Sequence, residues 1–269
     1  MIKKLKTLLS DSIKSQILGS KDVALLFSGG TDSLSMLFTL LDMGIKPTLY
    51  TFRLSEHESN DSKVSKFIAD KLDLKLKLII IPYNFKQLQK DVKYLITEFK
   101  SARKTVVQVT YPFLYIFPQV KEKFVVTGLS ADSNYGTPKS MAIKFRDDFD
   151  GFKKFKKKIF ENPYTDGYYT INELAKKYNL KLIVPYRNEA IINYLMDYSW
   201  RSLNFPRQKW FIVKAWQKEF NNLKVYRKND NLQVGSKIRE RMDKLLNSKL
   251  NHNYERVDEI YKRILKNSQ

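Results

Sequence analysis

The chain has 269 residues, 43% of them hydrophobic, which is enough for one large α/β domain with a packed core and argues against a disordered chain. It has no cysteine, which excludes disulfides, thiolate metal sites and cysteine nucleophiles, and its two histidines, His57 and His252, are far apart in sequence. The formal net charge of +21 favours an anionic partner or substrate, although an AT-rich genome produces the same lysine bias without any function.

No targeting or membrane segment is expected. The basic start Met1–Lys6 is not followed by a long apolar run, and no stretch reaches the length of an apolar membrane span. Together with the missing cysteines, this predicts a cytoplasmic protein without a membrane partner.

Apolar spacing predicts alternating helices and strands over the first 190 residues. Continuous apolar runs such as Val23–Phe27 suit buried parallel strands, whereas apolar residues three and four apart indicate helices. We expect helices at 1–18, 31–43, 60–72, 85–99 and 109–120, and strands at 23–27, 47–54, 76–81, 124–126 and 182–184. This alternation predicts an α/β fold with a doubly wound, mostly parallel five-stranded sheet.

The chain is expected to form an α/β domain over 1–188 and a helical C-terminal region over 189–269, packed on that domain. The least regular stretch, about 137–180, reads as a basic insertion rather than as a domain boundary. No internal repeat or low-complexity linker is present.

The segment Ser28-Gly-Gly-Thr-Asp-Ser33 lies between the first strand and the first helix that follows it. Its glycines let the main chain approach a ligand, and N–H groups at a helix start attract phosphate. Hydroxyl groups of the segment add donors. Asp32 would repel polyphosphate unless a divalent cation joined the two, so it indicates Mg²⁺. The residues expected to bind the cofactor here are Phe27, Ser28, Gly29, Gly30, Thr31, Asp32 and Ser33.

This segment has two alternative interpretations. A Walker P-loop needs a wider spacing and a Gly-Lys-Ser/Thr ending, which this segment lacks. A tight glycine turn with an N-capping hydroxyl explains a bare Gly-Gly pair, but it does not account for the whole hexapeptide between a strand and a helix.

The hexapeptide resembles the signature of the PP-loop ATP pyrophosphatases, whose fold is called adenine nucleotide alpha hydrolase-like. That resemblance implies an enzyme that cleaves ATP between the α- and β-phosphates and adenylates a substrate oxygen, after which a nitrogen or sulfur nucleophile displaces AMP. The chain looks most like the synthetase domain of asparagine synthetase and β-lactam synthetase. The segments in matching order include Thr51-Phe52, Val109–Tyr115, Thr127–Gly136, Lys209–Ala215 and Tyr226–Lys228.

Within this resemblance, Asp32 and Asp132 would be the Mg²⁺ carboxylates. Lys209 and Lys228 would neutralise the β- and γ-phosphates as pyrophosphate leaves, so the expected catalytic residues are Lys209, Lys228 and Asp132. The alternative for either lysine is a solvated charge, and for Asp132 a residue of an Asx-turn.

The same resemblance implies further contacts to ATP. Thr51 and Phe52 would receive the adenine, and Gly128, in the loop after the fourth strand, would contact the cofactor. The C-terminal helical region would complete the active site.

Three positions depart from the family pattern on the acceptor side. Leu129 stands where the family has a glutamate, Ser133 replaces an acidic residue, and Arg187 follows Val-Pro-Tyr where the family has Leu-Asp. Free aspartate, whose ammonium group needs negative partners, therefore becomes a weaker candidate. The family's glutaminase domain, with its cysteine nucleophile, has no counterpart here. Nitrogen would come from free ammonia, an amine or a separate amidotransferase subunit.

The basic insertion has two interpretations. Its lysines, with Phe152 and Phe155 between them, could bind a nucleic-acid backbone, and Arg103 and Lys104 could extend that surface. A solvated helix face with two buried phenylalanines explains the same pattern. The lysines concerned are Lys153, Lys154, Lys156, Lys157 and Lys158.

The sequence is compatible with three functions. The first is an ATP-dependent, AMP- and pyrophosphate-forming carbon–nitrogen ligase acting on a small-molecule or amino-acid acceptor. The second is a PP-loop enzyme that modifies a tRNA or DNA base. The third is a nucleotide-binding partner subunit without turnover. ATP and Mg²⁺ are the cofactors expected for the two enzymes.

Overall fold

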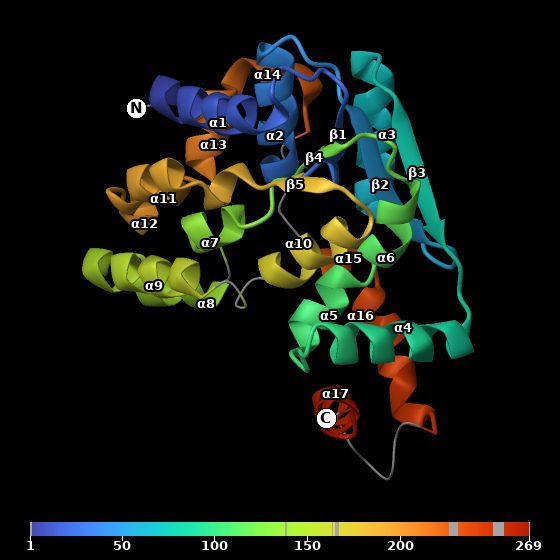
Figure 1. Ribbon diagram of the computed structural model, residues 1–269. Coiled ribbons are helices and arrows are strands. Elements are labelled where there is room, and N and C mark those ends of the chain that lie inside the picture. The colour runs from blue at the N-terminus through green and yellow to red at the C-terminus, as the bar shows by residue number, and fades with distance from the viewer. Residues whose placement is uncertain are drawn as a thin grey trace.

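A five-stranded parallel sheet forms the centre of the protein in a computed structural model (Figure 1). The structure describes residues 2–137, 139–162, 164, 167–225, 231–249 and 256–268. The strand order is β3-β2-β1-β4-β5, so the chain builds outward from β1 on one side and then on the other. The strands are β1 (Val23–Leu26), β2 (Thr48–Leu54), β3 (Leu76–Ile81), β4 (Phe124–Val126) and β5 (Lys181–Ile183). The strand order reverses between β1 and β4, which is where open sheets of this kind bind ligands.

Helices connect the strands and continue to the C-terminal end of the chain. Those up to β4 are α1 (Ile2–Ile17), α2 (Thr31–Asp42), α3 (Asn60–Leu72), α4 (Phe85–Glu98), α5 (Lys104–Thr110), α6 (Phe113–Ile116) and the 3₁₀ turn η1 (Phe117–Gln119). Between β4 and β5 lie α7 (Ala131–Tyr135), α8 (Lys139–Phe145), α9 (Phe149–Glu161) and α10 (Tyr168–Lys177). After β5 come η2 (Pro185–Arg187), α11 (Glu189–Met196), α12 (Trp200–Asn204), α13 (Trp210–Ala215), α14 (Gln217–Leu223), α15 (Leu232–Gly235), α16 (Ile238–Asp243), η3 (Lys244–Asn247) and α17 (Val257–Lys266).

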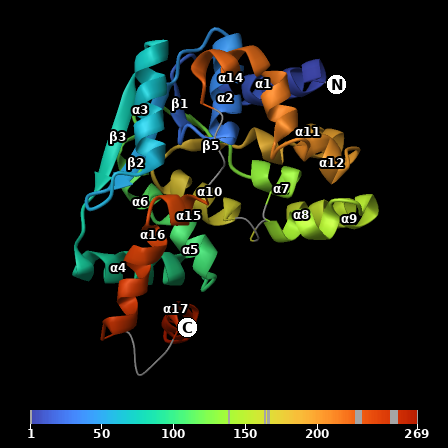
Figure 2. The same ribbon diagram turned by 180° about the vertical axis from the view of Figure 1, so that it is seen from behind.

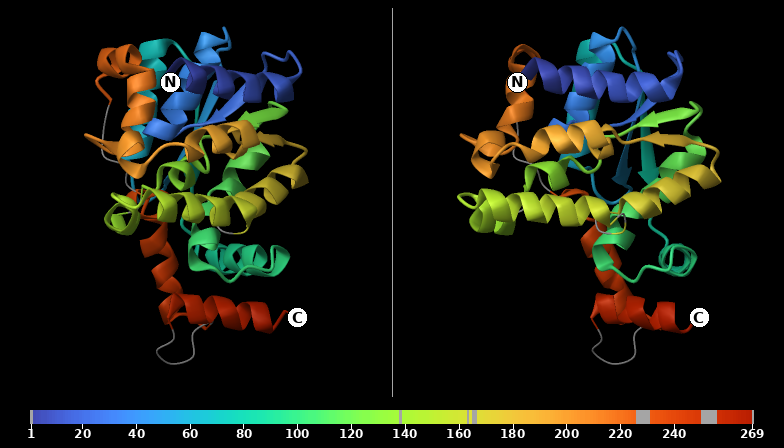
Figure 3. Two further views of the ribbon diagram at one scale, coloured as in Figure 1. Left: turned by 90° about the vertical axis from the view of Figure 1, so that its left-hand side faces the viewer. Right: turned by 60° about the vertical axis from the view of Figure 1, so that its left-hand side comes forward.

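Two hydrophobic cores lie on opposite faces of the sheet. Val23 and Leu25 of β1 point into the core that contains α1, α2 and α3, whereas Ala24 and Leu26 point into the core that contains α4, α5 and α17. Figure 2 shows α3 across β2 and β3, and Figure 3 shows α1 and α17 at opposite ends of the molecule. Because both faces are covered, the central strands are continuous apolar runs in the sequence.

The predicted fold class is confirmed, and the predicted strands agree closely with the observed ones. The predicted helix at 109–120 is different: α5 already begins at Lys104, and the segment is divided at Pro112 into α5, α6 and η1. Proline has no N–H to donate to the preceding turn, which explains the division.

The stretch 137–180 is more regular than we expected, because it contains α8, α9 and α10. In α9 Phe152 is fully buried, whereas Lys153, Lys154, Lys157 and Lys158 are exposed, as a solvated helix face requires.

Lys156 is the exception among these lysines, and its assignment to a surface patch is wrong. Its side chain is only 1% exposed. The Nζ atom lies 4.3 Å from the centre of the Phe152 ring and donates to the carbonyl oxygens of Leu195 at 2.6 Å and Tyr198 at 3.5 Å, at the C-terminal end of α11.

The helices after residue 188 pack on both faces of the sheet. Residues of α11 to α14 belong to the core that contains α1, and residues of α16 and α17 belong to the opposite core. Arg241 of α16 is buried and forms a two-pronged ion pair with Glu56 at 3.0 and 2.5 Å, while also donating to Ile81 O at 3.1 Å. These bonds fix α16 to the carboxyl ends of β2 and β3.

Among the described helices, none combines the length and the apolar character that a membrane crossing requires.

Candidate active site

The loop between β1 and α2 lies at the carboxyl end of the central strand. Gly29 has a φ of +69°, a conformation that side chains disfavour, and a Cβ atom there would lie 2.6 Å from Cγ1 of Val64. Glycine is therefore needed at this position both for its backbone angle and for its lack of a side chain.

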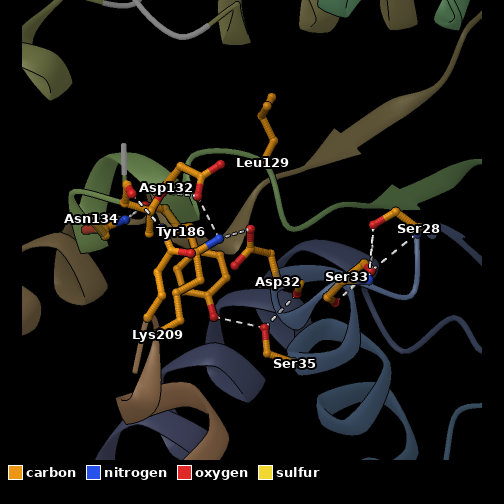
Figure 4. A network of polar contacts seen from close by, with 12 residues as sticks. Ser28, Asp32, Ser33, Ser35, Leu129, Asp132, Asn134, Tyr186 and Lys209 are labelled. Atoms are coloured by element: carbon orange, nitrogen blue, oxygen red, sulfur yellow. Dashed lines mark hydrogen bonds and ion pairs between the residues drawn. The ribbon is translucent and has the colours of Figure 1, made fainter. Parts of the chain in front are cut away.

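Two serines hold this loop in shape. Ser33 Oγ accepts the N–H of Ser28 at 3.3 Å and donates to Gly30 O at 3.1 Å, and Ser28 Oγ accepts the N–H of Gly30 at 3.2 Å (Figure 4). These hydroxyls were expected to face phosphate, but here they bond within the loop. Thr31 is buried, with 6% of its surface exposed.

The start of α2 retains backbone donors for an anion. The N-cap residue Gly30 provides no side-chain cap, and the first helical bond runs from the N–H of Leu34 to Gly30 O at 2.9 Å. The N–H groups of Thr31, Asp32 and Ser33 precede that bond and have no acceptor inside the helix. Such a helix start favours phosphate.

Lys209 joins two carboxylates at this helix start (Figure 4). Its Nζ lies 2.5 Å from Oδ2 of Asp32 and 2.6 Å from Oδ1 of Asp132. The lysine side chain is 1% exposed, Asp32 is 19% exposed and Asp132 is 59% exposed, so the cluster opens to solvent on the Asp132 side. Thr137 Oγ1 also donates to Asp132 Oδ1. We call Asp32, Asp132 and Lys209 the ion cluster.

Burial and charge act differently on the three members of the ion cluster. Desolvation raises the pKa of Asp32 to about 6, although Lys209 opposes the shift. For Asp132 the attraction of Lys209 outweighs desolvation and lowers the pKa. Desolvation would lower the pKa of Lys209, but the two carboxylates outweigh it and raise the pKa. Lys209 is therefore a protonated, buried cation.

Gly128 brings β4 close to Asp32. A Cβ atom on Gly128 would lie 2.7 Å from the carbonyl carbon, 2.8 Å from the carbonyl oxygen and 2.9 Å from the Cβ of Asp32. These are backbone and near-backbone atoms, which cannot move aside as the tip of a long side chain can. The absence of a side chain at Gly128 lets the α7 loop carry Asp132 next to the α2 helix start.

Asn204 of α12 positions Lys209 in a way that the sequence did not reveal. Its Oδ1 accepts the N–H of Lys209 at 2.9 Å, and its Nδ2 donates to Tyr135 O at 2.8 Å in α7. Lys209 itself has a φ of +57°, which is unusual for a residue with a side chain. Asn204 thus links the strained backbone of Lys209 to the helix that carries Asp132.

Other residues around the ion cluster tie α2, α7 and η2 together. Tyr186 OH lies 2.9 Å from Ser35 Oγ, and Ser35 donates to Asp32 O at 2.7 Å. Asn134 Nδ2 donates to Tyr186 O at 2.8 Å. The sequence did not indicate these bonds, because they join segments about 50 to 150 positions apart.

The oxygen atoms of the ion cluster fit a Mg²⁺ site. Among the described residues, Asp32 Oδ1 is buried without a hydrogen-bond partner, as are Asn134 Oδ1 and Tyr135 OH. Tyr135 is near enough for Asp32 to add to the effect of burial in raising its pKa. Carboxylate oxygens are the ligands that Mg²⁺ prefers, and phosphate oxygens and water commonly complete its shell. Asp32 and Asp132 therefore fit the metal, although the described residues hold no group of three His, Cys, Asp or Glu for one.

Thr51 and Phe52 lie beside the loop but inside a strand. β1 ends opposite Tyr50, whose carbonyl oxygen accepts the N–H of Phe27 at 2.8 Å, while β2 continues to Leu54 along β3. Thr51 and Phe52 therefore extend beyond the end of β1. Thr51 is buried and Phe52 is partly exposed.

Three other residues singled out from the sequence have different outcomes. Leu129 points away from the ion cluster (Figure 4). Arg187 stacks on Tyr168, with its guanidinium carbon 4.5 Å from the ring centre, and also packs against Phe160. Lys228 lies outside the described residues.

A parallel sheet with a Ser-Gly-Gly-Thr-Asp-Ser loop at its switch point defines the class of PP-loop ATP pyrophosphatase proteins. The model of the family described as asparagine synthase matches residues 4–139, about half of the chain. The chain therefore belongs to the asparagine synthase family. A search of curated proteins gave no match.

Solved structures with similar chains include three of low identity. A "predicted subunit of tRNA methyltransferase" from Methanocaldococcus jannaschii is 20% identical, covering 78% of this chain and 93% of that chain with a TM-score of 0.35. The U34-tRNA thiolase NcsA from Methanococcus maripaludis is 14% identical, covering 98% and 78%, with a TM-score of 0.37. The NMN synthetase from Francisella tularensis is 11% identical, covering 86% and 99%, with a TM-score of 0.36.

Proposed function

We propose that the protein is an ATP-dependent ligase that releases AMP and pyrophosphate while joining an activated substrate to ammonia or an amine. The observation that carries this proposal is the ion cluster, in which two carboxylates and a buried lysine meet at the free N-terminus of α2. Membership of the asparagine synthase family supports the same reaction class.

ATP would bind along the carboxyl edge of the sheet. The N–H groups at the start of α2 receive its phosphates, and Thr51 and Phe52 beside the loop receive its adenine. Gly29 and Gly128 let the backbone approach the phosphates and Asp32. The C-terminal region 189–269 completes the site, because α12 supplies Asn204 and the N-cap residue of α13 is Lys209.

Asp32 and Asp132 would hold Mg²⁺, which supplies charge neutralisation for the triphosphate when bound. Lys209 provides a second cation beside the phosphates. Negative charge grows on pyrophosphate as the bond between the α-phosphorus and the bridging oxygen breaks, so a cation held in place lowers the barrier. Lys228 is proposed for the same role from its sequence position alone.

The reaction has two steps. A carboxylate oxygen of the acceptor forms a bond to the α-phosphorus, and the bond to the bridging oxygen breaks to release pyrophosphate. An amine nitrogen then forms a bond to the acyl carbon, loses a proton, and AMP leaves with the oxygen that joined them. Leu129 and Arg187 stand where the family carries acidic residues, so an acceptor without a free ammonium group fits this chain better than aspartate.

The test of this function is exchange of labelled pyrophosphate into ATP with a panel of carboxylic acids. The wild-type protein should exchange with at least one acid and release AMP when an amine is added. Asp132→Asn should lower the exchange rate by about 100-fold or more, because it weakens charge neutralisation at the leaving group. The control is Asp147→Asn, at an exposed aspartate paired with Arg201, which should exchange normally.

Failure of the whole panel, with ATP binding intact, would refute the ligase and support a nucleotide-binding partner subunit without turnover. For the ligase, a separate amidotransferase subunit would deliver the nitrogen donor, and purification from the native source would reveal it.

A second function, modification of a nucleic-acid base, is favoured by the net charge of +21 and by the exposed lysines of α9. Phosphate contacts would make RNA binding strongly salt-dependent. In a gel shift with tRNA, affinity should fall steeply from about 50 to about 200 mM salt. The double variant Lys153→Glu/Lys154→Glu should weaken tRNA binding.

The control for that experiment carries the same charge change elsewhere. Lys90 and Lys93 are exposed on α4, which packs on the opposite core. If Lys90→Glu/Lys93→Glu weakened tRNA binding equally, only the net charge would matter. The α9 surface would then not be the site of nucleic-acid binding.

A further inference from the structure

Lys209 occupies the position between the two proposed metal ligands. Its Nζ is 2.5 Å from Asp32 Oδ2 and 2.6 Å from Asp132 Oδ1, and only 1% of its side chain is exposed. A Mg²⁺ ion lies about 2.0–2.1 Å from its oxygen ligands. A metal bound to both of these oxygens would therefore fall on nearly the same point as the ammonium group.

Two cations cannot share that point. They would overlap sterically, and their charges would repel each other at such a short distance. One of them must leave before the other can bind to Asp32 Oδ2 and Asp132 Oδ1 together.

We propose that Lys209 is the resident cation of the Asp32–Asp132 pair in the nucleotide-free protein and exchanges with the divalent metal when ATP binds. This inference rests on the metal site of the proposed function. It adds that Lys209 suppresses metal binding until a triphosphate is present.

The backbone around Lys209 restricts the exchange to its side chain. Asn204 Oδ1 accepts the N–H of Lys209, and Lys209 is the N-cap residue of α13, with a positive φ. The main chain of Lys209 is therefore held in place. The four-carbon side chain can rotate. Its only carboxylate partners among the described residues are Asp32 and Asp132. After leaving them, the ammonium needs a new anionic partner.

A triphosphate at the start of α2 supplies that partner. The released Nζ would then pair with phosphate oxygens instead of carboxylates, which places Lys209 beside the leaving pyrophosphate. Without nucleotide, the same release would leave a buried cation unpaired, which is costly. The exchange therefore predicts that nucleotide and metal strengthen each other's binding.

Mn²⁺ binding without nucleotide tests this directly, measured by electron paramagnetic resonance of the free ion. Lys209→Met removes the charge and keeps the length of the side chain. It should bind Mn²⁺ about tenfold more tightly than the wild type, or better. An unchanged or weaker affinity would overturn the proposal.

The matched control is Lys156→Met, which makes the same substitution at another buried lysine, away from the ion cluster. It should leave Mn²⁺ affinity unchanged, and an equal gain in this variant would also overturn the proposal. Adding Asp32→Asn to Lys209→Met should abolish the gain in Mn²⁺ affinity.

Lys209→Met leaves two carboxylates close together, so its folding needs a second measurement. Thermal unfolding with and without millimolar Mn²⁺ provides one. The melting temperature of Lys209→Met should rise with Mn²⁺ much more than that of the wild type, because the metal replaces the lost cation. Equal rises in the two proteins would contradict the exchange.

The exchange and the proposed function can fail separately. If the wild type exchanges pyrophosphate but Lys209→Met gains no Mn²⁺ affinity, the exchange is wrong and the ligase stands. If Lys209→Met gains Mn²⁺ affinity but no acid supports pyrophosphate exchange, the exchange stands and the ligase is wrong.

Discussion

At the scale of single residues, the candidate site depends on two glycines that make room for other atoms. Gly29 lies against Val64, and Gly128 lies against the backbone of Asp32. Gly29 was predictable from its motif. The contact of Gly128 was not, because it joins the end of β4 to a residue almost 100 positions earlier.

Gly128→Ala should weaken ATP binding by about tenfold or more, because the new methyl group would displace Asp32 from the start of α2. Calorimetric titration with ATP and Mg²⁺ measures this. Gly19→Ala is the control: Gly19 has a positive φ but no atom within 4 Å of the added Cβ. The control should lose stability, about 1 kcal/mol, and keep its ATP affinity. Normal ATP affinity in Gly128→Ala would contradict the role of this contact.

At the scale of elements, the strands were predictable and the contacts between distant helices were not. A strand that is covered on both faces is an apolar run, whatever covers it. The burial of Lys156 depends instead on α11, whose Leu195 carbonyl lies 39 positions away. Likewise, the αL backbone of Lys209 depends on Asn204 and α7. The family resemblance of Lys209–Ala215 indicated this lysine, but it did not indicate how its backbone is held.

The contact of α9 with α11 makes stability depend on pH. Burial is the main cause that lowers the pKa of Lys156 to about 7 in the folded protein, whereas an unfolded lysine titrates near 10.4. Between these values the unfolded state binds more protons, so stability should rise as pH increases from about 7.5 to about 9.5. One proton gives a slope of up to ~1.4 kcal/mol per pH unit.

Urea unfolding across that pH range measures the slope in the wild type and in Lys156→Met. The variant should show a flatter dependence and higher stability near pH 7.5, because it buries no group that must lose a proton. The same slope in both proteins would mean that Lys156 remains charged in its buried position.

At the scale of the whole molecule, the second half of the chain returns to the site formed by the first half. The family match ends at residue 139, yet Lys209 reaches Asp32 and Arg241 reaches Glu56. The sequence predicted the sheet and the loop at residues 28–33 between β1 and α2 from local patterns. The convergence of α7, α12 and α13 on that loop is a long-range property, which local patterns indicate only through resemblance to a family.

The proposed function requires that the loop at residues 28–33 and the carboxylate of Asp32 hold ATP together with Mg²⁺. Calorimetric titration of the wild type and Asp32→Asn with α,β-methylene-ATP, with and without Mg²⁺, tests it most directly. We expect Mg²⁺ to raise the affinity of the wild type by about tenfold or more, and to have no such effect on a folded Asp32→Asn protein. Equal affinity with and without Mg²⁺ in the wild type would mean that the protein does not hold the nucleotide through the metal.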